Sequence, residues 1–307
     1  MSTLRVSTLQ NASSATANIT LDASGNATVG GTLAMGSSFL RNRIINGGMR
    51  IDQRNAGASQ TITAAAALAY TVDRWYAYCT GANVTGQQVS STGTTDSPAQ
   101  NAYRFTGAAS VTAIGFGQRI EAVNCFDLAG QTATLSVNLA NSVLTTVTWT
   151  AFYANTTDTF GTLASPTVTQ IATGTFTVNS TLTRYTTNIS IPSAATTGIQ
   201  IVFTVGAQTS GTWTIGNVQL ERGSVATPFE RRQYGTELML CQRYYEASYV
   251  FVSSTLYPLY YKVTKRAAPI VGGGGAGFSS AGVITTEQTY ASQTTGAFQT
   301  LTFNSEL

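Results

Sequence analysis

Short stretches in which apolar and polar residues alternate run through most of the chain after residue 42. The clearest covers residues 146–154, where Val147, Trp149 and Ala151 alternate with Thr148 and Thr150. A period of two is typical of strands with one buried face. Because these stretches follow one another without helical patterns between them, residues 41–233 are predicted to form an antiparallel two-sheet jelly roll, or β-sandwich. Its first strand is expected at residues 43–53, and the alanine run at 64–67 is interpreted as a loop.

The pattern changes after the strand that contains Ile215, Val218 and Leu220 and stops at Gly223. From residue 236, apolar side chains recur at helical spacing, and they are Leu238, Leu240, Cys241, Tyr244 and Tyr245. This spacing predicts one short linking helix over residues 234–246, the only convincing helix in the sequence.

Two weaker β regions flank this central part. Residues 1–40 mix short apolar stretches with turn residues such as DASGN at 22–26, which predicts two or three small strands without a core of their own. We interpret them as a stem or attachment segment, with a flexible arm as the alternative. Residues 247–307 are expected to form a small β domain that begins with a strand pair turning at 253–256, with Pro258 placing the second strand at an edge.

Charged residues make up only 9% of the 307 residues, the net charge is +3, and 43% of residues are hydrophobic. This composition is typical of a folded chain, and so little surface charge favours a closed oligomer, which we expect to be a homotrimer. Lysine occurs only at Lys262 and Lys265 and no basic run is present, so nucleic acid is not expected as a partner.

The chain has no histidine, and its three cysteines, Cys79, Cys125 and Cys241, lie far apart without metal-binding spacing. A nucleophile would lack its usual base, and a transition metal its commonest ligand, so we expect neither a catalytic triad nor a cofactor. The first residues lack the apolar core of a signal peptide, and no stretch is apolar enough to span a bilayer. We therefore expect synthesis in a cytoplasm and, if the protein acts outside the cell, release by assembly and lysis.

Acidic side chains are scattered, although paired carboxylates are the minimum for glycoside hydrolysis. Asp52 beside Arg54, and Asp73 beside Arg74, are interpreted as partners that fix loops. Asp52 is also a weak calcium candidate, with Asn217 standing where similar modules often carry an acidic ligand. The other carboxylates considered for catalysis are Asp96, Glu121, Asp127, Asp158, Glu221 and Glu230.

Two aromatic clusters are candidates for stacking on sugar rings. The first includes Tyr76 and Tyr78, whereas Trp75 points to the opposite face and is expected in the core. Trp149, Phe152 and Tyr153 are candidates for the same cluster. The second cluster consists of Tyr249, Phe251, Tyr257, Tyr260 and Tyr261 in the C-terminal domain, where a trimer interface is the alternative.

Three blocks resemble bacteriophage and prophage tail-fibre or receptor-binding proteins: NRIINGGMRIDQRNAG at 42–57, YTVDRWYAY at 70–78 and VQLERGSVATPFERRQYGTELMLCQRYYE at 218–246. The resemblance implies a trimeric virion protein with a jelly roll similar to carbohydrate-binding modules. We expect a non-catalytic tail fibre that binds host surface glycan and attaches to other virion proteins through its N-terminal segment. The alternatives are a structural virion protein, such as a capsid decoration or neck fibre, and a tailspike depolymerase.

Overall fold

The protein is described here from a computed structural model that places residues 6–10, 12–13, 17–24, 26–29, 40–94, 97–252, 257–273, 278–280, 284–293 and 297–307. By its internal contacts the chain divides into residues 1–39 and residues 40–307. The first unit holds a three-stranded antiparallel sheet of β1 (Thr8–Leu9), β2 (Ile19–Leu21) and β3 (Ala27–Val29). Its strands are short, and among the described residues the apolar side chains of Leu9 and Leu21 are exposed and not part of a core.

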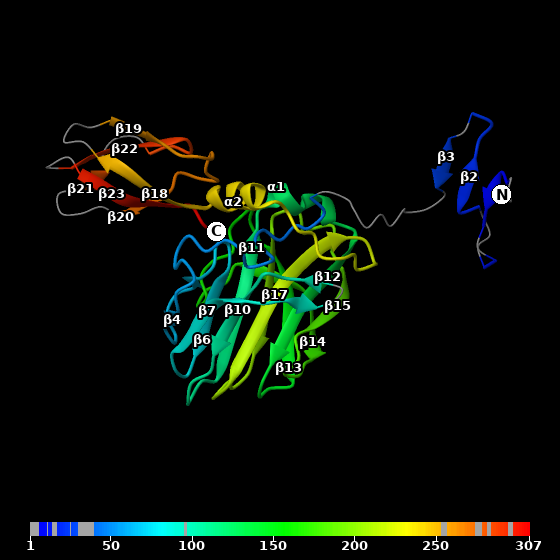
Figure 1. The fold of residues 1–307 in the computed structure, drawn as a ribbon, viewed down its shortest axis with the longest axis horizontal. Helices are drawn as coiled ribbons and strands as arrows, with labels where there is room; N and C mark the ends of the chain where they lie inside the picture. Colours follow the sequence, from blue (N-terminus) through cyan, green and yellow to red (C-terminus); the bar gives the residue numbers. More distant parts are fainter. Residues whose placement is uncertain are drawn as a thin grey trace. The chain divides into compact units, whose positions relative to one another are not determined.

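The second unit contains a sandwich of two six-stranded antiparallel sheets, as predicted (Figure 1). One sheet has the order β15-β12-β17-β10-β7-β4 and the other β14-β13-β16-β11-β6-β5. The strands of the first are β4 (Gln60–Ile62), β7 (Val84–Ser90), β10 (Asn101–Thr106), β12 (Thr132–Asn141), β15 (Thr183–Ser190) and β17 (Thr212–Arg222). Those of the second are β5 (Ala69–Tyr70), β6 (Tyr76–Thr80), β11 (Ala113–Ile120), β13 (Thr146–Ala154), β14 (Val168–Thr177) and β16 (Ile199–Val205). A short pair, β8 (Gly93–Thr94) and β9 (Ser97–Pro98), lies outside both sheets.

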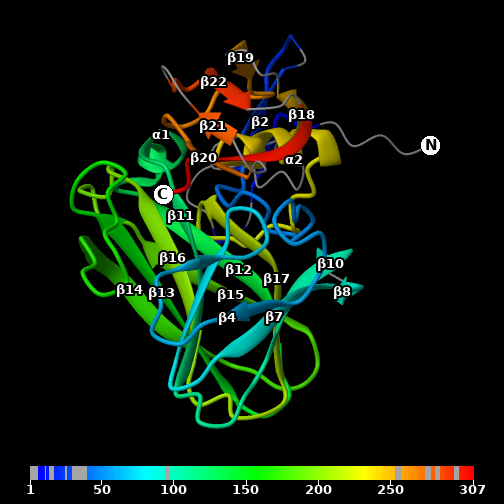
Figure 2. The same cartoon turned by 90° about the vertical axis from the view of Figure 1, so that its left-hand side faces the viewer.

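The two sheets face each other (Figure 2). Their inner faces share one apolar core, which contains the predicted Trp75. Its ring stacks on Phe116 with the ring centroids 4.7 Å apart, and Phe116 stacks on Tyr103 at 5.1 Å. Val147, Trp149 and Ala151 of β13 are buried while Thr148 and Thr150 are not, which confirms the predicted alternation. Cys79, Cys125 and Cys241 are free and buried, as small apolar residues would be.

Residues 43–53 do not form the predicted first strand. Positive φ values at Asn46 (55°) and Met49 (53°) turn the backbone away from an extended path. The segment instead packs along β17, where the backbone N–H of Val218 donates to Gly47 O at 3.0 Å. A Cβ atom on Gly47 would lie 2.1 Å from Val218 O, so glycine permits this close approach. The alanine run at 64–67 is a loop before β5, as interpreted from the sequence.

The linking helix is α2 (Tyr234–Gln242), four residues shorter than predicted because β18 already begins at Tyr245. Leu238 and Leu240 of this helix pack on a small apolar cluster formed by Ile45, Ile51, Cys241 and Tyr244. Sequence inspection missed a second, one-turn helix, α1 (Ala122–Cys125), which is continued by the 3-10 turn η1 (Phe126–Leu128). None of the helices in the described part of the chain has the length and apolar composition needed to cross a membrane.

The C-terminal region forms two three-stranded sheets, with the orders β18-β23-β20 and β19-β22-β21. The strands are β18 (Tyr245–Val252), β19 (Tyr257–Tyr260), β20 (Ile270–Gly273), β21 (Phe278–Ser280), β22 (Gln288–Gln293) and β23 (Ala297–Asn304). The predicted hairpin of β18 with β19 is wrong, because β18 pairs with β23 and β19 with β22. Pro258 does lie in an edge strand, as its missing N–H requires.

Substituting Leu240 with Asp should lower the free energy of unfolding by about 2 kcal/mol, because a carboxylate would enter the apolar cluster under α2. Chemical denaturation followed by tryptophan fluorescence measures this change. Met239→Asp is the matched control on the same helix, since the Met239 side chain is 54% exposed. Equal stabilities for the two variants would contradict the packing of α2 described above.

Candidate glycan-binding groove

The outer face of the β14-β13-β16-β11-β6-β5 sheet carries a groove with a volume of about 360 Å³. Four aromatic side chains line it, together with hydroxyl and amide side chains and one arginine. The lining residues used below are Tyr76, Tyr78, Phe152, Phe160, Arg119, Gln170, Gln200, Thr150 and Thr204. The groove therefore combines ring faces with hydrogen-bonding groups, which is the chemistry that sugar recognition requires.

Strand register arranges the groove floor in rows that cross the sheet. One row runs Gln170, Phe152, Gln200, Arg119 from β14 to β11. A second contains Thr150, Val202, Gly117 and Tyr76, and a third contains Thr204, Gly115 and Tyr78. Four adjacent strands span about 14 Å at the usual spacing of neighbouring strands, which is room for an oligosaccharide of a few units.

Two glycines of β11 make space for the tyrosine rings. A Cβ on Gly115 would lie 2.1 Å from the Tyr78 ring, and one on Gly117 would lie 2.5 Å from the Tyr76 hydroxyl oxygen. The rings of Tyr76 and Tyr78 thus lie across the backbone of β11, where any larger residue would displace them. The signal in the sequence was the alternation Gly115, Phe116, Gly117, which sequence inspection took as an ordinary strand.

The predicted aromatic residues lie at different depths. Tyr78 is half-buried in the groove, whereas Tyr76 is only 1% exposed and forms its base. Burial raises the pKa of both phenols, so they stay neutral hydrogen-bonding groups at physiological pH. Phe152 follows the inward-facing Ala151 in β13 and so points to this outer face, while the bulge beside it leaves Ile171 of β14 unpaired. Trp149 is buried, and Tyr153 packs against the core.

The second predicted cluster is not one site in the described part of the C-terminal region. Tyr249 and Tyr260 are 71% and 73% exposed, whereas Tyr261 is 9% exposed and packs on Phe303 with the ring centroids 4.8 Å apart. The side chains of Phe251 and Tyr257 lie outside the described residues. The described residues of this cluster therefore divide between a surface and a core.

Sequence inspection missed Arg119, which connects the floor of the groove to one of its walls. Its guanidinium donates to Gln200 Oε1 at 2.9 Å on the floor, to Gly161 O at 2.9 Å in one wall, and to Leu307 O at 2.8 Å. It also lies over the rings of Tyr76 and Phe160, at 5.5 and 5.3 Å from the ring centroids. An isolated arginine in the sequence gave no sign of this role.

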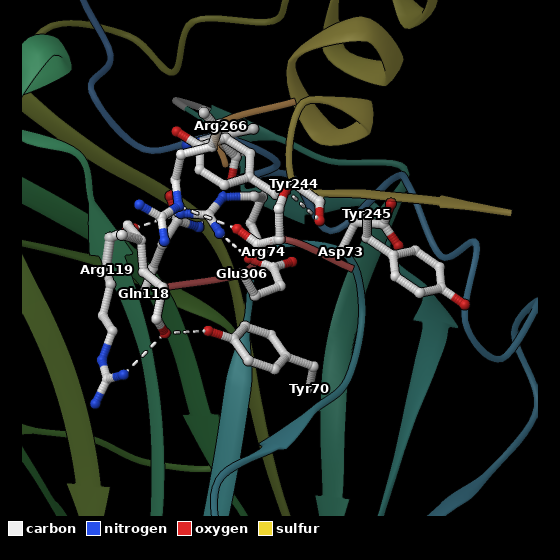
Figure 3. A network of polar contacts seen from close by, with 12 residues as sticks. Tyr70, Asp73, Arg74, Gln118, Arg119, Tyr244, Tyr245, Arg266 and Glu306 are labelled. Carbon is white, nitrogen blue, oxygen red and sulfur yellow. Dashed lines mark hydrogen bonds and ion pairs between the residues drawn. The ribbon is translucent and has the colours of Figure 1, made fainter. Parts of the chain in front are cut away.

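A buried polar network beside the groove ties the C-terminal segment to the sandwich (Figure 3). The carboxylate of Glu306 pairs with Arg74 and, at 3.2 Å, with Arg54. The guanidiniums of Arg74 and Arg54 lie over the rings of Tyr244 and Tyr245, at 3.4 and 3.6 Å from the ring centroids. These arginines were expected to pair with their neighbours in sequence, and they pair with Glu306 instead.

The carboxylates considered for catalysis or metal binding have structural partners wherever the structure describes them, and Asp96 lies outside the described residues. Asp52 accepts hydrogen bonds from the backbone N–H groups of Asn55 and Gly57, at 3.0 and 2.8 Å, and so closes its own loop. Glu121 accepts from Arg243 and from the Tyr244 hydroxyl, the latter at 2.7 Å. Over the ranges that the structure describes, no three His, Cys, Asp or Glu residues gather as a metal site.

A larger groove of about 520 Å³ lies on the outer face of the other sheet. Ser, Thr and Gly residues and Arg104 line most of it, and it has no aromatic side chain. Without a ring face for stacking, it is a weaker match to a sugar than the groove that contains Tyr78.

No family model and no curated protein matches the chain. Among solved structures, it is similar to the enzymatically active domain of tailspike protein 4 from bacteriophage CBA120, with 17% identity, a TM-score of 0.39, and 62% of this chain and 24% of that chain covered. It is also similar to the carbohydrate-binding module TmCBM61 in complex with β-1,4-galactotriose, with 12% identity, a TM-score of 0.33, and 48% of this chain and 88% of that chain covered. A third similar structure is the family 11 carbohydrate-binding module from Clostridium thermocellum, with 12% identity, a TM-score of 0.31, and 54% of this chain and 96% of that chain covered. The chain spans about a quarter of the length of the tailspike chain.

The free energy of unfolding should depend on pH through the ionisation of Asp73. The carboxylate of this residue accepts a hydrogen bond from the backbone N–H of Gln53 at 3.0 Å. Burial raises the pKa of this carboxyl group to about 6, against the opposing effects of Gln53 and Arg54. The folded state thus holds the proton more tightly than the unfolded state, so a contribution of up to about 3 kcal/mol is present below about pH 4 and is lost as the pH rises through 6.

The Asp73→Asn variant should lack this loss, so its free energy of unfolding should fall less than that of the wild type between pH 4 and pH 7.5. Urea denaturation at several pH values measures the difference. Asp127→Asn is the control, because the Asp127 side chain is 31% exposed at the surface. The same pH slope for Asp73→Asn and wild type would contradict the assignment.

Proposed function

We propose that this protein binds glycans in the Tyr78 groove without cleaving them. The observation that carries the proposal is the floor of the groove, where the half-buried ring of Tyr78 lies over Gly115, the buried Tyr76 forms the base over Gly117, and the row from Gln170 to Arg119 supplies amides and an arginine. Rings of this kind stack on sugar faces, and the adjacent amides and hydroxyls pair with sugar hydroxyls.

We further propose that the chain is a tail-fibre subunit of a phage virion that adsorbs to host surface polysaccharide. The support is the resemblance of residues 42–57, 70–78 and 218–246 to such proteins, together with the low charge of the chain. A homotrimer would present three grooves on one particle, so weak individual affinities would combine into strong adsorption. The N-terminal unit would attach to other virion proteins.

The second candidate is a structural virion protein that uses its surfaces only for other virion proteins. The exposed Tyr249 and Tyr260 of the C-terminal region favour this alternative, since exposed aromatic residues often mark protein interfaces. Incubating the protein with bacterial surface polysaccharides, and assaying both binding and new reducing ends, separates the possibilities. Binding without new reducing ends supports the proposal, new reducing ends indicate a depolymerase, and no binding indicates a structural role.

The variant Tyr78→Ala should bind glycan about tenfold more weakly, because it removes one stacking face and about 1.4 kcal/mol of binding free energy. Isothermal titration with xylohexaose, β-1,4-galactotriose and a β-1,3-1,4-linked glucan tetrasaccharide measures the affinity. Tyr249→Ala is the control, because Tyr249 belongs to the other candidate cluster and is 71% exposed. Loss of affinity in Tyr249→Ala, with Tyr78→Ala unchanged, would move the site to the C-terminal region.

A further inference from the structure

The C-terminal segment Ser305–Leu307 contacts two residues that belong to, or support, the groove. Leu307 O accepts one hydrogen bond from the Tyr70 hydroxyl at 2.7 Å and another from Arg119 Nη1 at 2.8 Å. Figure 3 shows Tyr70 and Arg119 reaching the same point from two sides. Since one oxygen atom satisfies both donors, displacing the segment would leave two buried polar groups without this acceptor.

Both donors act on the floor of the groove. The ring of Tyr70 packs edge-to-face on Tyr76, with the centroids 6.3 Å apart, and Tyr70 does not itself line the groove. The guanidinium of Arg119 holds the wall through Gly161 O and the floor through Gln200. The guanidinium of Arg119 thus donates to three acceptors, Leu307 O, Gly161 O and Gln200 Oε1, and the position of Leu307 O affects its contacts with the other two.

The segment is itself held by residues that do not line the groove. Glu306 is paired with Arg74 and Arg54, and Arg74 also donates to the backbone carbonyl of Arg119. Ser305 donates its backbone N–H to Tyr244 O at 2.7 Å, and its carbonyl accepts from Arg266 Nε at 3.0 Å. Tyr244, which precedes β18, and Arg266, which follows it, both bond to Ser305. The C-terminal sheets are therefore connected to the groove through residues 305–307.

We propose that Ser305–Leu307 is a positioning element for the groove, so that seating of the C-terminal segment and occupation of the groove by glycan favour each other. This inference rests on the proposed glycan function. By thermodynamic linkage, any factor by which the seated segment raises glycan affinity is also the factor by which glycan favours the seated segment. Tyr70, Glu306 and Arg119 are the positioning residues of this coupling.

The sharpest variant is Tyr70→Phe, which removes one hydroxyl and leaves every groove-lining side chain in place. We expect its affinity for the three oligosaccharides named above to fall about three- to tenfold, the effect of one lost hydrogen bond. Tyr185→Phe is the matched control, since Tyr185 lies on β15 of the opposite sheet. Equal affinities for Tyr70→Phe and wild type would overturn the coupling.

Linkage gives a second readout that a purely structural role would not change. Saturating oligosaccharide should slow amide hydrogen exchange at residues 301–307 in the wild type, and this protection should shrink in Tyr70→Phe. Unchanged exchange at 301–307 in a wild-type protein that binds the probe would overturn the proposal.

A third measurement needs no glycan and so separates the two proposals. The ¹⁹F NMR signal of 3-fluorotyrosine placed at position 76 should shift or broaden in Glu306→Gln, whereas the same label at position 185 should not change. An unchanged signal at position 76 overturns the coupling, whether or not glycan binds. A shifted signal in a protein that binds none of the oligosaccharides overturns the glycan assignment and supports the physical link between segment and groove.

Discussion

The buried carboxylate of Glu306 determines how residues 40–307 are held together. A carboxylate that is removed from water must be paired, and here the arginines of the two loops before β6, Arg54 and Arg74, meet it while their guanidiniums stack on Tyr245 and Tyr244. Because Tyr244 follows α2 and Tyr245 begins β18, one acidic side chain links the first loops of the sandwich, the linking helix and the end of β23. Replacing Glu306 would leave two buried guanidiniums without their carboxylate.

A second buried pair repeats this arrangement within the C-terminal region. Lys265 is fully buried, and its ammonium lies 2.7 Å from the carboxylate of Glu246 at the start of β18. Desolvation lowers the pKa of Lys265, and the contact with Glu246 opposes that shift. Among the described residues of this region, the apolar core cluster consists of Val252, Leu259, Tyr261, Leu301 and Phe303. The ammonium of Lys265 bonds both to Glu246 of β18 and to Gln242 O of α2, so this buried pair fixes how the C-terminal strands pack against the helix.

The sequence allowed the sandwich to be predicted because period-two alternation is a local property, and β13 shows it from Thr146 to Phe152. The same reasoning failed at residues 43–53, where positive φ at Asn46 and contacts with β17 override the apolar pattern. It also failed for the pairing of β18, because its partner β23 lies about fifty residues away and local alternation carries no pairing information. Tyr76, Tyr78 and Phe152 could be named in advance, but the role of Arg119 became visible only through strand register.

The glycine floor has a consequence for how recognition can diversify. With Gly115 and Gly117 beneath them, the rings of Tyr76 and Tyr78 have little freedom to reorient, so the base of the groove is rigid before any ligand arrives. The walls, in contrast, come from connecting segments such as the loop with Phe160 and Leu163. Insertions or substitutions in such loops leave the strand ladder intact, so the shape and chemistry of the groove walls can change without rebuilding the scaffold.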